Sequence, residues 1–215
     1  MNRTGVFILI VLSSCSKKEA AETKSIENKD TVVQNIEIQA QKEEDTASLP
    51  FSQSLKENGY LYTLKGLESP NGAINFKSIN IFYKNKLHQK IIVDTVSVLN
   101  EREVVFSADK DANFDGYKDV ELINWAGNYS YSSSFWLYNQ KTGKYDHYKP
   151  LDTIQNIKID AGRREITSNY HIGPANTYSK TYQWKNGKLL MMSAHIVEEG
   201  EEIQIYRKNG KIIVE

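Results

Sequence analysis

The pattern of hydrophobic and polar positions divides the chain into three parts. A short apolar run occupies residues 5–12, and residues 16–49 follow with few apolar positions and no aromatic, glycine or proline residue. From Pro50 onward, short apolar stretches alternate with polar turn residues, and all 13 tyrosines and three tryptophans lie in this part. The pattern therefore predicts a targeting segment, a tether and one folded domain of about 165 residues.

The folded part has the patterning of a β-protein. Residues 76–83 alternate in part, so that Ile79 and Ile81 share one face, and residues 91–99 are rich in β-branched side chains. No window in this part keeps a helical period over three turns. We therefore predict a single all-β, antiparallel domain over residues 50–215.

Three turn signals separate apolar stretches in the second half, at residues 139–144, 185–188 and 208–211. The Asn-Gly pairs of the last two supply the positive φ angles of a type I′ hairpin turn. The first spacing between the turn glycines is close to the length of a propeller blade, and the second is about half of it. The expected fold is a degenerate β-propeller-like domain, with a barrel or a sandwich as alternatives.

The N-terminal segment has the features of a lipoprotein signal peptide. Arg3 precedes the apolar run at residues 5–12, which is shorter than the ~20 residues that a bilayer span needs. Small serines lead up to Cys15, the only cysteine of the chain, whose thiol would accept diacylglycerol. We therefore predict a signal peptide over residues 1–14 and lipidation at Cys15. The alternative is an ordinary signal peptide followed by an unmodified cysteine.

The segment after the cysteine predicts a flexible tether. Residues 16–49 are rich in Lys, Glu, Gln, Ser and Thr, and they bury too little apolar surface to offset their chain entropy. A short helix around residues 32–38 is the alternative. Lys17 and Lys18 stand where an aspartate often accompanies retention in the inner membrane. We therefore expect a lipid-anchored protein of the cell envelope, on the outer membrane and facing the periplasm.

Charge and motif content exclude several function classes. The 27 basic and 27 acidic residues balance, so no global field favours nucleic acid. No cysteine follows position 15, so the domain has no disulfides. The four histidines are scattered, and neither an H-E-x-x-H nor a G-x-S-x-G string occurs. We therefore expect neither a nucleic-acid partner nor an enzyme.

Residues 111–119, the acidic loop, carry the sharpest chemical signal. Oxygen ligands recur at alternate positions with Gly116 at the sixth place, as in the first part of an EF-hand calcium loop. Ca²⁺ prefers six to eight hard oxygen ligands, and alternate side chains of a tight loop point inward. The predicted ligands of a structural calcium ion are Asp111, Asn113, Asp115, the Tyr117 carbonyl and Asp119.

The acidic loop departs from the EF-hand pattern in two ways. Its twelfth position is Leu122 rather than glutamate, and the flanking residues 104–106 and 120–125 resemble strands rather than helices. It is therefore similar to the single calcium loops that brace β-domains outside the cell, which bind at ~10⁻⁴–10⁻³ M. The alternative is a solvated Asp/Asn/Gly turn that holds no metal.

The string Asn-Phe-Asp-Gly-Tyr-Lys-Asp at residues 113–119 resembles the N-F-D-G-Y-x-D signature of a family of small bacterial envelope lipoproteins. Further elements resembling that family follow in the same order, at residues 138–145, 151–156, 166–168 and 182–189. The resemblance covers roughly residues 104–190. It implies a β-propeller-like fold with a bound calcium ion.

Characterised members of that family are immunity proteins that look like periplasmic lysozyme inhibitors. The resemblance therefore implies a lysozyme-like peptidoglycan hydrolase as the protein partner, with its active site occluded. Tyrosines among small polar residues suit an adaptable contact surface. The candidate contact residues are Asn128, Tyr129, Ser130 and Tyr131. The alternatives are a polar hairpin without this role and, for the whole protein, a structural or glycan- or protein-binding module of the envelope.

Overall fold

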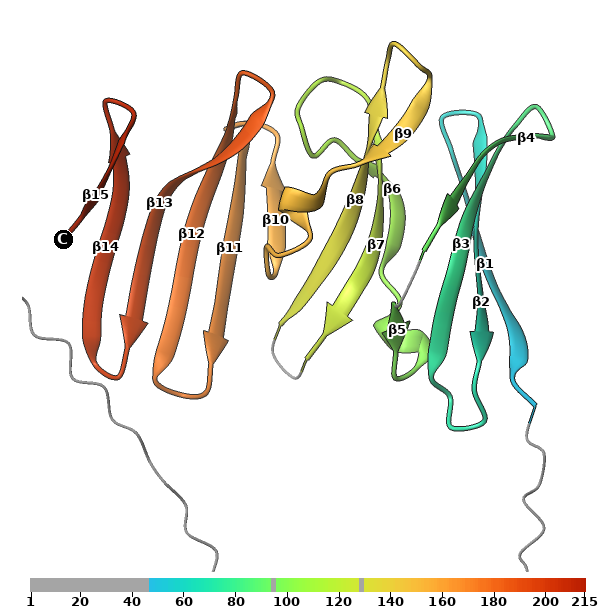
Figure 1. Cartoon of the computed structure of the whole chain (residues 1–215), viewed down its shortest axis with the longest axis horizontal. Coiled ribbons are helices and arrows are strands. Elements are labelled where there is room, and N and C mark those ends of the chain that lie inside the picture. Colours follow the sequence, from blue (N-terminus) through green and yellow to red (C-terminus); the bar gives the residue numbers. More distant parts are fainter. Residues whose placement is uncertain (1–46, 94–95, 128–129) are drawn as a thin grey trace, which may run out of the picture. The chain divides into compact units, whose positions relative to one another are not determined.

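The computed structural model describes residues 47–93, 96–127 and 130–215 (Figure 1). The predicted signal peptide, Cys15 and nearly all of the predicted tether lie outside the described residues. The first strand begins at Leu49, next to the predicted start of the folded domain. No helix in the described ranges is both long and apolar enough to cross a membrane.

Fifteen strands and two short 3₁₀ helices make up the regular structure of the described residues. In chain order the strands are β1 (Leu49–Glu57), β2 (Tyr60–Glu68), β3 (Ile74–Tyr83), β4 (Lys86–Ile92), β5 (Ser97–Val98), β6 (Phe106–Lys110), β7 (Asp119–Ala126), β8 (Tyr131–Asn139), β9 (Lys144–His147), β10 (Ile157–Asp160), β11 (Glu165–Ile172), β12 (Asn176–Lys185), β13 (Lys188–Glu198), β14 (Glu201–Lys208) and β15 (Lys211–Val214). The helices are η1 (Glu101–Glu103) and η2 (Lys149–Leu151).

The strands form three antiparallel sheets (Figure 1). The first sheet has the order β1-β2-β3-β4, with β5 also paired to β3. The second has the order β6-β7-β8-β9, and the third runs from β10 to β15 in sequence order. Within each sheet, and apart from β5, strands that follow each other in the chain are paired, so each sheet is an up-and-down meander.

The prediction of an all-β, antiparallel domain is confirmed. None of the sheets formed by the described residues closes into a barrel, which removes the barrel alternative. An up-and-down meander is the topology of a propeller blade, which typically has four strands. The second sheet has four strands, whereas the first has five and the third has six. The propeller-like character therefore lies in the topology within each sheet.

The two predicted Asn-Gly hairpin turns are present. In the β12–β13 turn the φ angles of Asn186 and Gly187 are 51° and 72°, and in the β14–β15 turn those of Asn209 and Gly210 are 51° and 78°. Positive φ at both central residues is the mark of a type I′ turn. Three further two-residue turns with positive φ lie at residues 58–59, 84–85 and 199–200.

Two hydrophobic clusters form the core. Ile79 and Ile81 are fully buried in the first cluster, which combines residues of the first and second sheets. The second cluster combines residues of the second and third sheets, including Ile166. Trp136 and Phe135 are neighbours on β8 but join the first and the second cluster respectively. This follows because successive side chains of a strand point to opposite faces, so the second sheet contributes to both cores.

Gln89 of β4 joins the first sheet to the second. Its Nε2 donates a hydrogen bond to the Tyr145 carbonyl (2.8 Å), and its Oε1 accepts one from the Tyr145 N–H (2.8 Å). The side-chain amide thus takes the place of a residue on a neighbouring strand. The Tyr145 hydroxyl also lies 2.6 Å from the Tyr62 hydroxyl. Burial raises the pKa of both phenols, so the pair remains neutral.

Replacing Gln89 with leucine should lower the free energy of unfolding by about 2–4 kcal/mol. The substitution leaves both backbone groups of Tyr145 without a partner, and each unpaired group costs about 1–3 kcal/mol. Urea denaturation measures the change. Lys90→Ala, at the exposed neighbouring position on β4, is the matched control and should change stability by less than about 0.5 kcal/mol. Equal effects for the two variants would contradict a stabilising role of the Gln89–Tyr145 hydrogen bonds.

Candidate functional site

Hydrogen bonds among its own residues shape the acidic loop, which joins β6 to β7. The carboxylate of Asp111 accepts from the N–H groups of Asp115 (3.1 Å) and Gly116 (2.8 Å). Asn113 Oδ1 also accepts from the Asp115 N–H (3.2 Å), and Asp115 Oδ1 accepts from the Tyr117 N–H (2.9 Å). Gly116 has a φ of 92°, a conformation that glycine adopts without steric cost.

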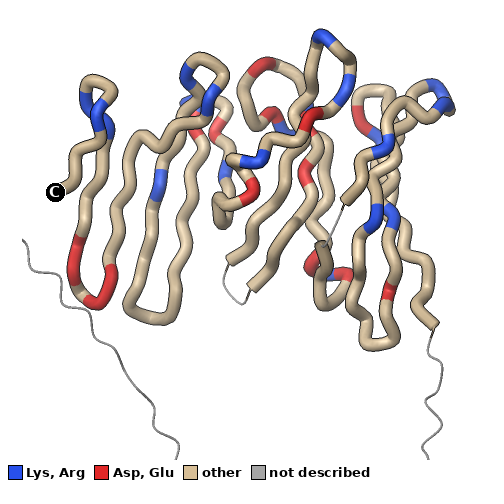
Figure 2. Tube along the Cα trace, in the orientation of Figure 1, with Lys and Arg blue, Asp and Glu red and all other residues tan. Residues whose placement is uncertain are grey.

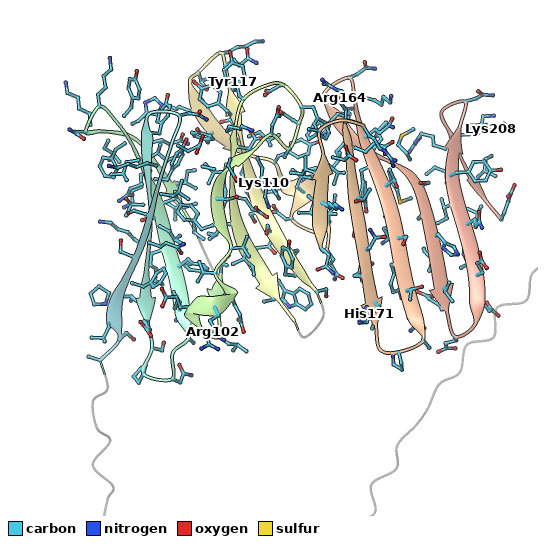
Figure 3. The ribbon with its side chains drawn as sticks, turned by 180° about the vertical axis from the view of Figure 1, so that it is seen from behind. Arg102, Lys110, Tyr117, Arg164, His171 and Lys208 are labelled. Atoms are coloured by element: carbon cyan, nitrogen blue, oxygen red, sulfur yellow. The ribbon has the colours of Figure 1, made fainter. Side chains whose placement is uncertain are left out.

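Side chains of the third sheet and its β10–β11 turn donate hydrogen bonds to the acidic loop. The side chains of Ala112 and Phe114 are buried in the second cluster. Arg164 Nη2 donates to the Phe114 carbonyl (2.7 Å), and Trp184 Nε1 donates to the Ala112 carbonyl (2.8 Å). Figure 3 shows Arg164 at the same end of the strands as Tyr117 of the loop. Sequence analysis missed both hydrogen bonds because the donors lie 50 and 72 residues from their partners.

Asp119 closes the base of the acidic loop. It is fully buried, and its two oxygens accept hydrogen bonds from the N–H groups of Ala112 (2.7 Å) and Tyr138 (2.9 Å). Burial raises the pKa of Asp119 to about 7, the two N–H bonds oppose the rise, and the charges of Asp115 and Asp111 add to it. The Asp119 side chain therefore links the loop to β8 by accepting hydrogen bonds from backbone N–H groups of both.

The donor chemistry of the acidic loop is compatible with calcium. Asp111, Asn113 and Asp115 are joined by hydrogen bonds, so their oxygen atoms lie within one small region. Asp119 differs, because both of its oxygens already accept from backbone N–H groups. Within the described ranges, no three His, Cys, Asp or Glu side chains converge as a metal cluster. Calcium binding by the five predicted ligands stays a prediction.

An ion pair with a buried carboxylate and a partly exposed lysine lies on the two strands that flank the acidic loop. Glu121 of β7 is fully buried, and its Oε2 lies 2.5 Å from Lys110 Nζ at the end of β6. Ser107 Oγ donates to the same oxygen (3.0 Å). Figure 3 shows Lys110 in the second sheet. The pair was not expected from the sequence, because a buried Glu within an apolar strand shows no motif.

The predicted contact residues Ser130 and Tyr131 lie where the β7–β8 hairpin turns into β8. Asn128 and Tyr129 fall outside the described residues. Ser130 and Tyr131 are half-buried. The Tyr131 N–H donates to Asn156 Oδ1 (3.0 Å), so this residue is anchored at the start of β8. The structure places Ser130 and Tyr131 next to each other at this hairpin, and a role of the four residues in partner binding remains a prediction.

Trp125 is an exposed aromatic side chain beside this tip. Its side chain is 47 % exposed, and a Cβ added to Gly127 would lie 2.7 Å from Trp125 Cη2. The indole therefore covers Gly127, whose N–H donates to the Ser130 carbonyl (2.8 Å) and closes the tip. Sequence analysis did not single out Trp125. The available signal was a tryptophan at the end of an apolar stretch that enters a polar turn.

The serines after the tip are interior residues. Ser132, Ser133 and Ser134 are buried in β8. Asn124 connects two of them, because its Oδ1 accepts from Ser132 Oγ (2.5 Å) and its Nδ2 donates to Ser134 Oγ (3.2 Å). A contact surface on this hairpin is therefore confined to its tip.

Tyrosines line a cleft of about 380 Å³ between the β1–β2 hairpin end and the acidic loop. The Tyr117 and Tyr138 rings are stacked, with centroids 5.2 Å apart, and Tyr138 meets Tyr145 edge to face. Burial, followed by a hydrogen bond with Tyr138, raises the pKa of Tyr60 to about 12. Near neutral pH the Tyr60 phenol therefore presents a hydroxyl rather than a negative charge. The lining residues are Asn58, Tyr60, Gly116, Tyr117, Lys118, Tyr138 and Tyr145.

Comparison with known proteins gives one likeness of fold. Family models and curated proteins give no match to the chain. A solved structure described as a Xanthomonas type IV secretion system related protein resembles this chain with a TM-score of 0.57 and 14% sequence identity. The match covers 76% of this chain and 92% of that chain. At this identity, the likeness establishes a shared fold.

Proposed function

We propose that this chain is an envelope lipoprotein that inhibits a lysozyme-like peptidoglycan hydrolase. The observation that carries the proposal is the string at residues 113–119 with its ordered downstream elements, which resembles a family of such inhibitors. The likeness of fold to a type IV secretion system related protein is consistent with an envelope-associated role. The lipid on Cys15 anchors the domain to the outer membrane, and the tether lets it reach the cell wall.

The tip of the β7–β8 hairpin is the part of the domain that would enter the hydrolase cleft. Lysozyme-like enzymes place two carboxyl groups on either side of the scissile bond, so a narrow inserted segment blocks the substrate. Of the four predicted contact residues, Ser130 and Tyr131 are described and lie at this tip, and Trp125 stands beside it. A partly exposed tryptophan is a frequent energetic anchor of protein interfaces.

The proposed calcium ion has a structural role. The acidic loop precedes β7, the first strand of the inhibitory hairpin. Asp111, Asn113, Asp115 and the Tyr117 carbonyl would hold the ion, with Asp119 fixing the base of the loop. Bound calcium supplies positive charge between carboxylates that otherwise repel each other. The loop residues thereby hold the start of β7 in one position.

Asp115→Asn tests the calcium ion. In chelator, the variant should be about as stable as the unsubstituted chain. The amide keeps the acceptor for the Tyr117 N–H, and removal of a charge beside Asp111 offsets the loss of the exposed hydrogen bond from Asn113 Nδ2. In 10 mM Ca²⁺ it should melt roughly 3–10 °C lower, because a site with a Kd of ~10⁻⁴–10⁻³ M stabilises by about 1.4–2.7 kcal/mol. Differential scanning fluorimetry measures both shifts. Asp109→Asn, just outside the loop, is the control, and an unchanged melting temperature on adding calcium to the unsubstituted chain would refute binding.

A turbidity assay tests the inhibitor proposal directly. The chain without its lipid anchor is added to peptidoglycan suspensions with lysozyme-like hydrolases, including any encoded beside its gene. We expect slower clearing with at least one of these enzymes, at a molar ratio near one. Unchanged lysis by every enzyme of the panel would rule the proposal out.

The tyrosine-lined cleft favours one alternative, a glycan-binding module of the envelope. Aromatic faces pack against sugar rings, and Tyr117, which is 43% exposed, lies on Tyr138 at the mouth of the cleft. In this case Tyr117→Ala should reduce sedimentation with insoluble peptidoglycan at least about fivefold, the loss of roughly 1 kcal/mol. Trp125→Ala, at an exposed aromatic side chain that does not line this cleft, is the control. Sedimentation that neither variant alters would argue against this alternative.

A further inference from the structure

β15 is the outer strand of the third sheet, and one of its edges is open. The sheet order ends at β15, which pairs with β14, and no other described strand pairs with it. Its Ile212 and Val214 side chains are 54 % and 63 % exposed. An exposed apolar edge strand is a template for pairing with another strand. The free edge of β15 is therefore available for pairing with another β-strand.

The hydrogen bonds to β14 show which backbone groups are free. Glu215 exchanges both backbone hydrogen bonds with Gln204 (2.8 and 2.9 Å). Because such pairs alternate along an antiparallel ladder, Ile213 also turns its N–H and C=O toward β14. Ile212 and Val214 therefore direct their N–H and C=O groups outward, away from the sheet.

The sequence of this edge is complementary to itself when read in the opposite direction. Lys-Ile-Ile-Val-Glu at residues 211–215, paired antiparallel with a second copy, sets Lys211 opposite Glu215 of the other copy. Ile213 then faces its own equivalent on the two-fold axis, and Ile212 faces Val214. In this register the outward N–H and C=O groups of Ile212 and Val214 meet as hydrogen-bonded pairs. This one register therefore satisfies the charge pairs, the apolar contacts and the backbone hydrogen bonds together.

We propose that two copies of this chain associate through antiparallel pairing of their β15 strands. The pairing joins two six-stranded sheets into one continuous sheet. The apolar face bearing Val214 continues through Ile205 to the buried Ala194, which are successive partners across the sheet. Figure 2 shows basic residues at the β14–β15 turn and acidic residues at the β13–β14 turn. An isologous contact of this kind closes with two copies, because it occupies the β15 edge of both.

A cysteine at the proposed axis tests the register. In the full chain carrying Cys15→Ser, Ile213→Cys should form an interchain disulfide under mild oxidation, because non-hydrogen-bonded pairs lie about 4.5 Å apart at Cα. Ile212→Cys is the matched control, since its equivalents would lie about 8 Å apart and should not cross-link efficiently. Equal cross-linking of the two variants, or none in either, would overturn the proposal.

Charge reversal at two exposed residues provides a second test, in which Glu215→Lys also removes the hydrogen bond that the Tyr206 hydroxyl donates to Glu215 (2.6 Å). Sedimentation velocity over a concentration series should show a monomer–dimer equilibrium for the Cys15→Ser chain. Lys211→Glu alone and Glu215→Lys alone should each weaken dimerisation about 3- to 30-fold, since each dimer contains two such cross-strand pairs. The double reversal should restore the original dissociation constant within about threefold. A monomer at every concentration, or no rescue by the double reversal, would refute the interface.

Discussion

Lys110→Met should lower the free energy of unfolding by about 3 kcal/mol. Glu121 is fully buried, and Lys110 Nζ is the cation that lies beside its carboxylate at 2.5 Å. Removing one partner of a buried pair leaves an uncompensated charge, which costs about 3–5 kcal/mol. The lower end is expected here because the Lys110 side chain is 35 % exposed and water can approach the vacated position. Urea denaturation of the variant at neutral pH measures the loss.

The charge explanation is separated from loss of packing by two further variants. Lys110→Arg retains the positive charge and should cost less than about 1 kcal/mol. Lys110→Met combined with Glu121→Gln removes both charges and should recover more than half of the loss, because a neutral amide is less costly to bury. If the double variant were less stable than Lys110→Met alone, the carboxylate would not be the source of the penalty.

Trp125→Ala should weaken inhibition of the target hydrolase about 30- to 1000-fold, a loss of about 2–4 kcal/mol of binding free energy. The indole is the large exposed aromatic group at the tip of the β7–β8 hairpin and covers Gly127. Truncation removes this contact and leaves the buried strands of the hairpin unchanged. Titrating the variant in the lysis assay gives the inhibition constant.

Two controls place this effect at the hairpin tip. Tyr83→Ala removes an exposed aromatic side chain from a turn of the first sheet and should leave the inhibition constant within about twofold. Gly127→Ala puts a methyl group where the indole now lies, so it should weaken inhibition in the same direction as Trp125→Ala. Loss of inhibition by Tyr83→Ala, with Trp125→Ala still active, would move the contact surface to the other turn.

Local signals predicted the sheets well. The Asn-Gly pair at residues 186–187 determines its own turn, because both residues accept positive φ, and alternation put Ile79 and Ile81 on the buried face. The same chemistry occurs at Asn58 and Gly59, where the sequence analysis overlooked it. The number of strands in each sheet was not predictable, because no local pattern specifies where one meander stops and the next begins.

Of the candidate site, the sequence predicted the local loop but not the contacts that its residues make with distant parts of the chain. The spacing of Asp111, Asn113 and Asp115 predicted a tight loop, and in the structure the Asp111 and Asn113 side chains both accept from the Asp115 N–H. Alternation alone did not reveal that Asp119 turns to the N–H groups of Ala112 and Tyr138. The burial of the serines in β8 was missed for a related reason. Ser132 and Ser134 hydrogen-bond to Asn124 across the hairpin, and this partner is not apparent from the local sequence. The hydroxyl of Ser133 is buried without a hydrogen-bond partner among the described residues.

The up-and-down order of the strands bears on how the chain reaches its native state. Sheets made of consecutive hairpins have mostly local contacts, and low contact order favours fast folding. Five of the turns are two residues long, so the loops to be closed are as short as hairpins permit. Each sheet can therefore assemble as soon as its own segment is available, before later segments arrive. A chain that crosses a membrane from its N-terminus onward would build its first sheet while the third is still unfolded on the other side.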